Sequence, residues 1–184
     1  GPLPPRPLPR PLHAATSATS RTTKTIRARL TVRGFKDSDR GDVDRYAGTS
    51  SRASQKLLCS EAVLRGWTLI TTDISKAFLQ GVTYKELAEL AGTQEREVNF
   101  YLPAHNIPLL RTIAGFETFD PQTEVLHCDK PGTGSVDAPR AFSLKLKNLL
   151  TTEGKMQVCS IDNEFVFRHD SHGKLIGFMA IHVD

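Results

Sequence analysis

The C-terminal third of the chain constrains the fold most, because one amphipathic stretch there is followed by two strand-like stretches. Residues 137–153 place apolar side chains at helical spacing, with Pro139 in the first turn and Gly154 at the end. Residues 164–168 and 175–184 predict two strands joined by a polar turn. A helix followed by a hairpin predicts the α+β class, with an antiparallel sheet backed by helices.

The sequence upstream predicts further helices, strands and loops. Ser51 suits the N-cap of a helix that ends at Gly66, where glycine favours a left-handed C-cap. Residues 67–72 predict a buried strand. The other expected elements are a strand at 26–33, a loop at 36–51, a turn or helix at 75–80, a helix near 82–91 and a strand near 97–101.

The N-terminal segment has a different composition from the rest of the chain. Six of the eleven prolines lie within the first eleven residues, and a small polar stretch follows them. Such a segment buries little apolar surface, so residues 1–24 are expected to be a disordered Pro-rich linker. A spacer between polyprotein domains is a better interpretation of it than a ligand for proline-recognition modules. Residues 25–184 are expected to form one domain.

Composition excludes several protein classes. The 184 residues are 39% hydrophobic and 24% charged, as in ordinary globular domains. The sequence has no apolar run of the roughly 18 to 20 residues that a membrane span needs, and no signal-peptide pattern at its start. Its three cysteines form no C-x-x-C pair. We therefore expect a soluble protein in a reducing compartment, cut from a longer chain.

Charge is distributed unevenly along the chain. Residues 1–52 carry a net charge of +7 and residues 53–184 a net charge of −3. Within the basic part lie Arg33, Lys36 and two further arginines at 27 and 29. Such a cluster neutralises the phosphates of a nucleic acid or a triphosphate. A solvated basic strand is an equally good interpretation of the same residues.

Two aspartates stand at the ends of expected strands. Asp73 follows the strand at 67–72, and Asp184 ends the last strand. Carboxylates in such positions suit Mg²⁺, which prefers oxygen ligands from protein and phosphate. The alternatives are a helix N-cap for Asp73 and a solvated end position for Asp184.

Histidines near the C-terminus offer weaker candidates. His169 and His172 have the spacing of a metal pair, but a hairpin turn is the better interpretation of their segment. His182 suits a general acid or base, although a packed or surface imidazole is commoner.

Four short blocks, taken in order, resemble the reverse transcriptase domain of copia-type LTR retrotransposons. They are TIRARLTVRGF at 25–35, TDISKAFLQG at 72–81, DAPRAF at 137–142 and IHVD at 181–184. The resemblance covers residues 25–184. It implies the fingers and palm portion of a right-hand polymerase, with an antiparallel palm sheet backed by helices.

The resemblance also implies site residues. Asp73, the carbonyl of Ile74 and Asp184 match the family's Mg²⁺ ligands, and Phe78 matches the bulky ring that excludes ribonucleotides. Arg29, and with it Arg27, would reach the incoming nucleotide. The remaining implied residues, Asp137, Pro139 and Arg140, open the helix that supports the template and the nucleotide.

The activity that the resemblance implies is RNA-directed DNA polymerisation. A primer 3′-hydroxyl attacks the α-phosphorus of a deoxynucleoside triphosphate with the help of two Mg²⁺ ions. The implied partners are an RNA or DNA template-primer, deoxynucleoside triphosphates and the rest of a Pol polyprotein with its RNase H and integrase. No membrane partner is implied. The implied location is intracellular, in a cytoplasmic retrotransposon particle.

The sequence also departs from the family pattern. The second aspartate of the catalytic hairpin does not follow Asp184, and Thr133, Ser135 and Val136 replace residues usual in the block before 137–142. We therefore expect no polymerase activity from this fragment alone. A non-catalytic, basic nucleic-acid-binding remnant is the alternative function. A third possibility is a structural α/β domain without a ligand.

Overall fold

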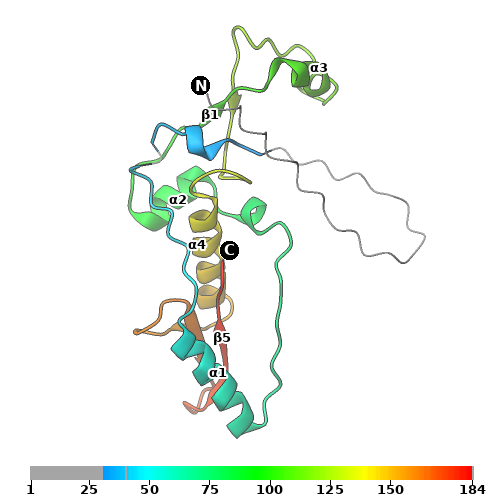
Figure 1. Cartoon of the computed structure of the whole chain (residues 1–184). Coiled ribbons are helices and arrows are strands. Elements are labelled where there is room, and N and C mark those ends of the chain that lie inside the picture. Colours follow the sequence, from blue (N-terminus) through cyan, green and yellow to red (C-terminus); the bar gives the residue numbers. More distant parts are fainter. Residues whose placement is uncertain (1–30, 40, 184) are drawn as a thin grey trace, which may run out of the picture.

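The computed structural model describes residues 31–39 and 41–183 and combines helices with small antiparallel sheets (Figure 1). The expected α+β class is therefore confirmed. The α-helices of the described part are α1 (Arg52–Arg65), α2 (Tyr84–Ala91), α3 (Ile107–Leu110) and α4 (Ala138–Thr152). Short 3₁₀ helices are η1 (Gly34–Lys36), η2 (Ala77–Gln80) and η3 (Ala104–Asn106). The strands are β1 (Asn99–Phe100), β2 (Leu126–His127), β3 (Gln157–Val158), β4 (Phe165–His169) and β5 (Leu175–Ala180).

The two long helices begin and end where their capping residues predict. The Ser51 side chain accepts a hydrogen bond from the Ser54 amide at the start of α1, and Gly66 closes this helix with φ 65°. Helix α4 starts directly after Asp137, with Pro139 in its first turn. Both expected helices are confirmed.

A three-stranded antiparallel sheet forms the C-terminal part of the fold, in the order β3-β4-β5. The expected hairpin is confirmed as β4 and β5, with Val166 opposite Met179. Strand β5 ends at Ala180, earlier than expected, and an isolated bridge then joins His182 to Thr49. Strand β3, which the sequence pattern did not predict, adds the third strand.

The end of α1 and a lysine of α4 contact different sides of the chain at the start of β4. The rings of Phe165 and Phe178 lie 5.8 Å apart, and Trp67, just past α1, lies 5.3 Å from Phe178. Glu164, which precedes β4, instead binds Lys147 of α4. Consecutive side chains of an extended chain point to opposite sides, so Lys147 of α4 binds on the side away from the aromatic contacts of Phe165.

A hydrophobic core lies around α3, which Figure 1 places at the opposite end of the molecule from α1. Strands β1 and β2 form a two-stranded antiparallel sheet there. The buried residues of this core are Ile107, Leu110, Phe119 and Leu126, and Phe100 and Leu102 pack against them. The sequence predicted only the strand near 97–101, and the structure shortens it to β1.

The expected buried strand at 67–72 is wrong. These residues run as an extended segment outside both sheets of the described chain (Figure 1). Leu69 is 53% exposed and Ile70 is 82% exposed. Within the described residues these side chains meet no neighbouring strand, and the chain just past β5 pairs instead with Thr49 and Ser50, through the bridge to His182 and the hydrogen bond to Ile181.

Other expectations fall partly or wholly outside the described residues. The Pro-rich segment 1–24 and most of the expected strand at 26–33 cannot be compared with the structure. Residues 31–33 are described and are not in a strand, and η1 begins at Gly34, where the expected strand was to end. Within residues 31–39 and 41–183, no helix combines the length and apolar character that crossing a membrane requires.

Asp162 joins the start of α1 to the turn before β4. Its carboxylate accepts hydrogen bonds from the Ser51 amide at 2.7 Å, the Ser54 hydroxyl and the Glu164 amide. These bonds, led by that of Ser54, lower the pKa of Asp162 from 3.8 to about 2. A carboxyl group with a lowered pKa stabilises the fold above pH 3.8 and loses this effect as the pH falls through about 2.

We expect Asp162→Ala to lower the free energy of unfolding by about 1–3 kcal/mol at pH 7, because two segments lose their shared acceptor. Urea denaturation followed by the fluorescence of Trp67 measures this change. The difference from wild type should shrink between pH 4 and pH 2. Asp129→Ala, which changes a 91% exposed side chain, is the matched control. An Asp162→Ala variant as stable as this control would contradict the prediction.

Candidate functional site

Asp73 lies on the exposed extended segment that leads from α1 to η2. Ile74 beside it is 38% exposed, and Phe78 is half-buried within η2. The N-cap of η2 is Lys76, with φ 56°, so Asp73 does not cap this helix as the alternative interpretation suggested. Helix η2 packs against α4, where a Cβ on Gly81 would lie 3.2 Å from the Ala141 Cβ.

Three other predicted site residues lie outside the described part of the chain. These are Asp184, the second predicted Mg²⁺ ligand, and Arg27 and Arg29, which were predicted to contact the nucleotide. The convergence of Asp73 and Asp184 on shared Mg²⁺ ions therefore stays a prediction. In the part of the chain that is described, no three His, Cys, Asp or Glu side chains gather as a metal site would require.

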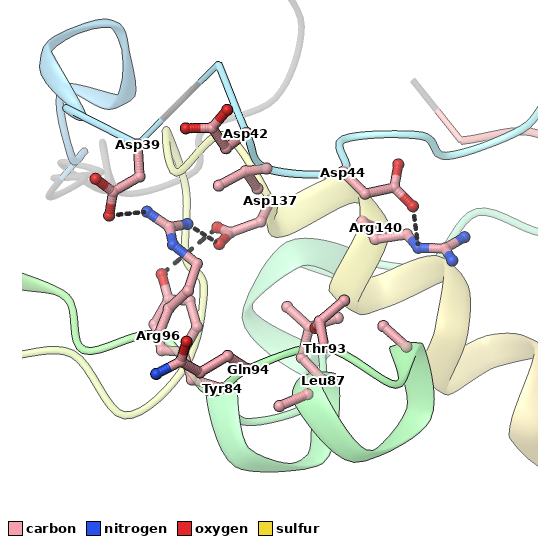
Figure 2. A pocket seen from close by; sticks show the side chains of 13 residues that line it. Asp39, Asp42, Asp44, Tyr84, Leu87, Thr93, Gln94, Arg96, Asp137 and Arg140 are labelled. Atoms are coloured by element: carbon pink, nitrogen blue, oxygen red, sulfur yellow. Dashed lines mark hydrogen bonds and ion pairs between the residues drawn. The ribbon is translucent and has the colours of Figure 1, made fainter.

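Of the other predicted residues, Asp137 and Arg140 border a cavity of about 380 Å³ at the start of α4, whereas Pro139 is not part of its lining (Figure 2). The loop before α1 contributes Asp39, Asp42 and Asp44 to one wall. Helix α2 contributes Leu87, Ala88 and Ala91, and Arg96 and Arg140 complete the lining together with Asp137. The structure thus brings Asp137 and Arg140 together at one site.

Arg96 connects three parts of the chain at this cavity. Its Nη1 donates to Asp137 Oδ2 at 2.5 Å, and its Nη2 donates to both oxygens of Asp37, at 3.0 and 2.8 Å. The guanidinium lies 5.9 Å from the centre of the Tyr84 ring, a cation–π distance. Tyr84, at the start of α2, also places its hydroxyl 3.5 Å from Asp137 Oδ1.

Burial dominates the protonation of these groups. Asp137 is 1% exposed, and its burial raises its pKa although the ion pair with Arg96 acts in the opposite direction. Burial also raises the pKa of the Tyr84 hydroxyl, and the nearby Asp137 carboxylate adds to this effect. Arg96 is therefore the compensating charge that makes a buried Asp137 carboxylate tolerable.

Arg140, on the first turn of α4, pairs with the opposite wall of the cavity. Its Nε lies 3.2 Å from Asp44 Oδ2, without the alignment of a hydrogen bond. Four aspartates and two arginines line the cavity, so its wall carries a net negative charge. A triphosphate is disfavoured inside such a wall, whereas a neutral or cationic group is not.

Segment 31–34 lies directly against the residues that precede α4. The Val32 amide donates to Thr133 O at 3.0 Å, and the Gly34 amide donates to Gly134 O at 3.1 Å. A Cβ on Gly34 would lie 2.3 Å from Gly134 O, so the two backbones touch. This contact brings the basic segment, which carries Arg33 and ends at Lys36, to the start of α4.

Sequence reasoning missed Arg96, Asp37 and Tyr84. The available signal was weak: an aspartate-rich loop at 37–44 that was expected only to be a loop. The expected turn with His169 and His172 is confirmed, since Asp170 accepts hydrogen bonds from the amides of His172 and Lys174, both at 2.9 Å.

A scan against protein-family models, a search of curated proteins and a search of solved structures each gave no match to this chain.

Proposed function

We propose that this chain is part of a copia-type reverse transcriptase domain, from the fingers and palm of a right-hand polymerase. The observation that carries the proposal is the order of four sequence blocks, at 25–35, 72–81, 137–142 and 181–184. Two of these blocks adjoin a helix or a strand in the described part of the structure, which supports the proposal. The block at 137–142 opens α4, and the block at 181–184 directly follows β5.

In this proposal, Asp73, the carbonyl of Ile74 and Asp184 hold Mg²⁺. Carboxylate and carbonyl oxygens are suitable ligands for this hard cation. The bound ions would supply charge neutralisation at the reacting phosphate. The chain's own residues would position the substrates, with Phe78 beside the sugar and Arg27 and Arg29 beside the incoming nucleotide.

The proposed substrates are deoxynucleoside triphosphates and an RNA or DNA template-primer. The acidic cavity beside Asp137 and Arg140 does not suit a triphosphate, so the phosphates would lie outside it, toward the basic segment. The proposed setting is a Pol polyprotein with RNase H and integrase, in a cytoplasmic retrotransposon particle.

A second candidate function is nucleic-acid binding without catalysis. It is favoured by the net charge of +7 on residues 1–52. Such binding would weaken steeply with salt and would not depend on Asp73. The salt dependence of binding to a primed template separates this function from nucleotide binding.

Asp73→Asn is expected to weaken Mg²⁺-dependent binding of deoxyadenosine triphosphate by about tenfold or more, because it removes a carboxylate charge from the proposed metal ligands. Titration calorimetry with and without Mg²⁺ measures this change. Asp129→Asn, an exposed carboxylate far along the sequence, is the control and should not affect binding. The proposed function would be refuted if Asp73→Asn bound the nucleotide as tightly as wild type, or if wild type showed no saturable binding.

A further inference from the structure

Arg96 links two segments that have no sequence motif in common. One is η1 with the turn that follows it, held through Asp37, and the other is the start of α4, held through Asp137. We propose that Arg96 is a positioning residue, which fixes the basic segment ending at Lys36 against the start of α4. This inference rests on the proposed function, in which these two segments hold the incoming nucleotide.

Backbone hydrogen bonds join residues 31–36 to the residues before α4 at Val32 and Gly34. The hydrogen bonds of Val32 and Gly34 to residues 133 and 134 lie at the start of η1, whose first residue is Gly34. Asp37 lies directly after η1, where its amide donates to Gly34 O at 3.1 Å. The ion pair with Arg96 therefore adds a second anchor on the far side of η1, and two anchors fix an orientation that one leaves free.

The site makes this anchor rigid. The side chains of Arg96 and Asp37 are only 19% and 18% exposed, and that of Asp137 is 1% exposed. Little water reaches the ion pairs, so they are poorly screened. The planar guanidinium reaches both carboxylates while it lies over the Tyr84 ring, which a lysine ammonium cannot reproduce.

Loss of Arg96 should affect nucleotide binding and nucleic-acid binding differently. Without Arg96, Arg33 and Lys36 keep their charges but lose their fixed position beside α4. Affinity that depends on orientation, such as that for one nucleotide, should fall. Salt-dependent binding to nucleic acid, which depends on charge alone, should remain.

The test uses the full chain with Arg96→Lys, Arg96→Met and Arg96→Met/Asp137→Asn. The double variant removes the buried charge that Arg96→Met leaves uncompensated, so that folding is preserved. We expect each variant to weaken Mg²⁺-dependent binding of deoxyadenosine triphosphate by about tenfold or more. Hydrogen exchange should become faster in residues 31–39 and stay unchanged in residues 157–181.

Arg65→Met is a closely matched control. Arg65 also pairs with a carboxylate, Glu61 at 2.8 Å, and its guanidinium lies 5.3 Å from the centre of the Trp67 ring. It lies on α1, away from the start of α4, so neither nucleotide binding nor exchange in residues 31–39 should change.

The outcomes distinguish this inference from the function on which it rests. If wild type binds no nucleotide, the proposed function fails, and exchange in residues 31–39 still decides whether Arg96 holds the segment. Unchanged exchange there in the double variant would overturn the positioning role. Faster exchange in residues 31–39 of the double variant, with the same nucleotide affinity as wild type, would also overturn it. The position of the segment would then not matter for nucleotide binding.

Discussion

Lys147→Met is expected to lower the free energy of unfolding by about 3 kcal/mol, because it leaves the Glu164 carboxylate buried without its cation. Lys147 Nζ lies 2.6 Å from Glu164 Oε1, and the Glu164 side chain is 2% exposed. Oε2 of this carboxylate has no hydrogen-bond partner in the described part of the chain. Urea denaturation with fluorescence of the single tryptophan, Trp67, measures the loss.

Two further variants test the cause of this loss. Lys147→Met/Glu164→Gln removes both charges, and we expect it to recover more than half of the stability that the single change costs. Lys145→Met, an exposed lysine on the same helix, should change stability by less than about 0.5 kcal/mol. If the double variant were no more stable than Lys147→Met, lost packing rather than an uncompensated charge would explain the effect.

Gly134→Ala should detach segment 31–34 from the residues before α4. Gly134 has φ 92°, and a Cβ there would lie 2.2 Å from Val32 O and 2.6 Å from Thr31 Cγ2. The left-handed backbone costs about 1–2 kcal/mol for alanine, and the collision with a backbone oxygen adds to it. Hydrogen exchange at Val32 and Gly34 should rise sharply, and urea denaturation should give the total loss.

Gly173→Ala separates the two contributions. Gly173 lies in the β4–β5 turn with φ 77°, and a Cβ there would meet nothing within 4 Å. This variant should lose only the conformational part, about 1 kcal/mol. Equal losses in both variants would mean that the close approach at Gly134 contributes nothing.

Local signals predicted the helices well. Ser51 and Gly66 gave the ends of α1 within one residue, and Pro139 gave the first turn of α4. Caps work because the groups that they satisfy lie within a few residues of the signal itself. The hairpin of β4 and β5 was predictable for the same reason, since its turn lies between its strands.

Sequence patterns failed for segments whose structure depends on a partner far away in the sequence. Residues 67–72 have the apolar and β-branched composition of a buried strand, but composition does not show whether a neighbouring strand is available. The structure gives them none within the described residues, and Leu69 and Ile70 stay in solvent. Strands β2 and β3, with two residues each, were too short for any periodicity.

The candidate site was only half visible in the sequence. Asp137 and Arg140 were identified through the resemblance, and the structure brings both to one cavity. Arg96 comes from a segment without a motif, 41 residues before Asp137. A single arginine among ordinary charged residues becomes informative only when folding surrounds it with carboxylates.

The largely exposed stretch at residues 67–72 also affects how the protein behaves at high concentration. It contains six residues without charge, proline or glycine, and most of them favour extended conformations. Identical stretches of this kind stack in register as cross-β ribbons when many copies meet. We therefore expect association through this stretch to compete with folding at high concentration, and the carboxylate of Asp73 to oppose that association by charge repulsion between copies.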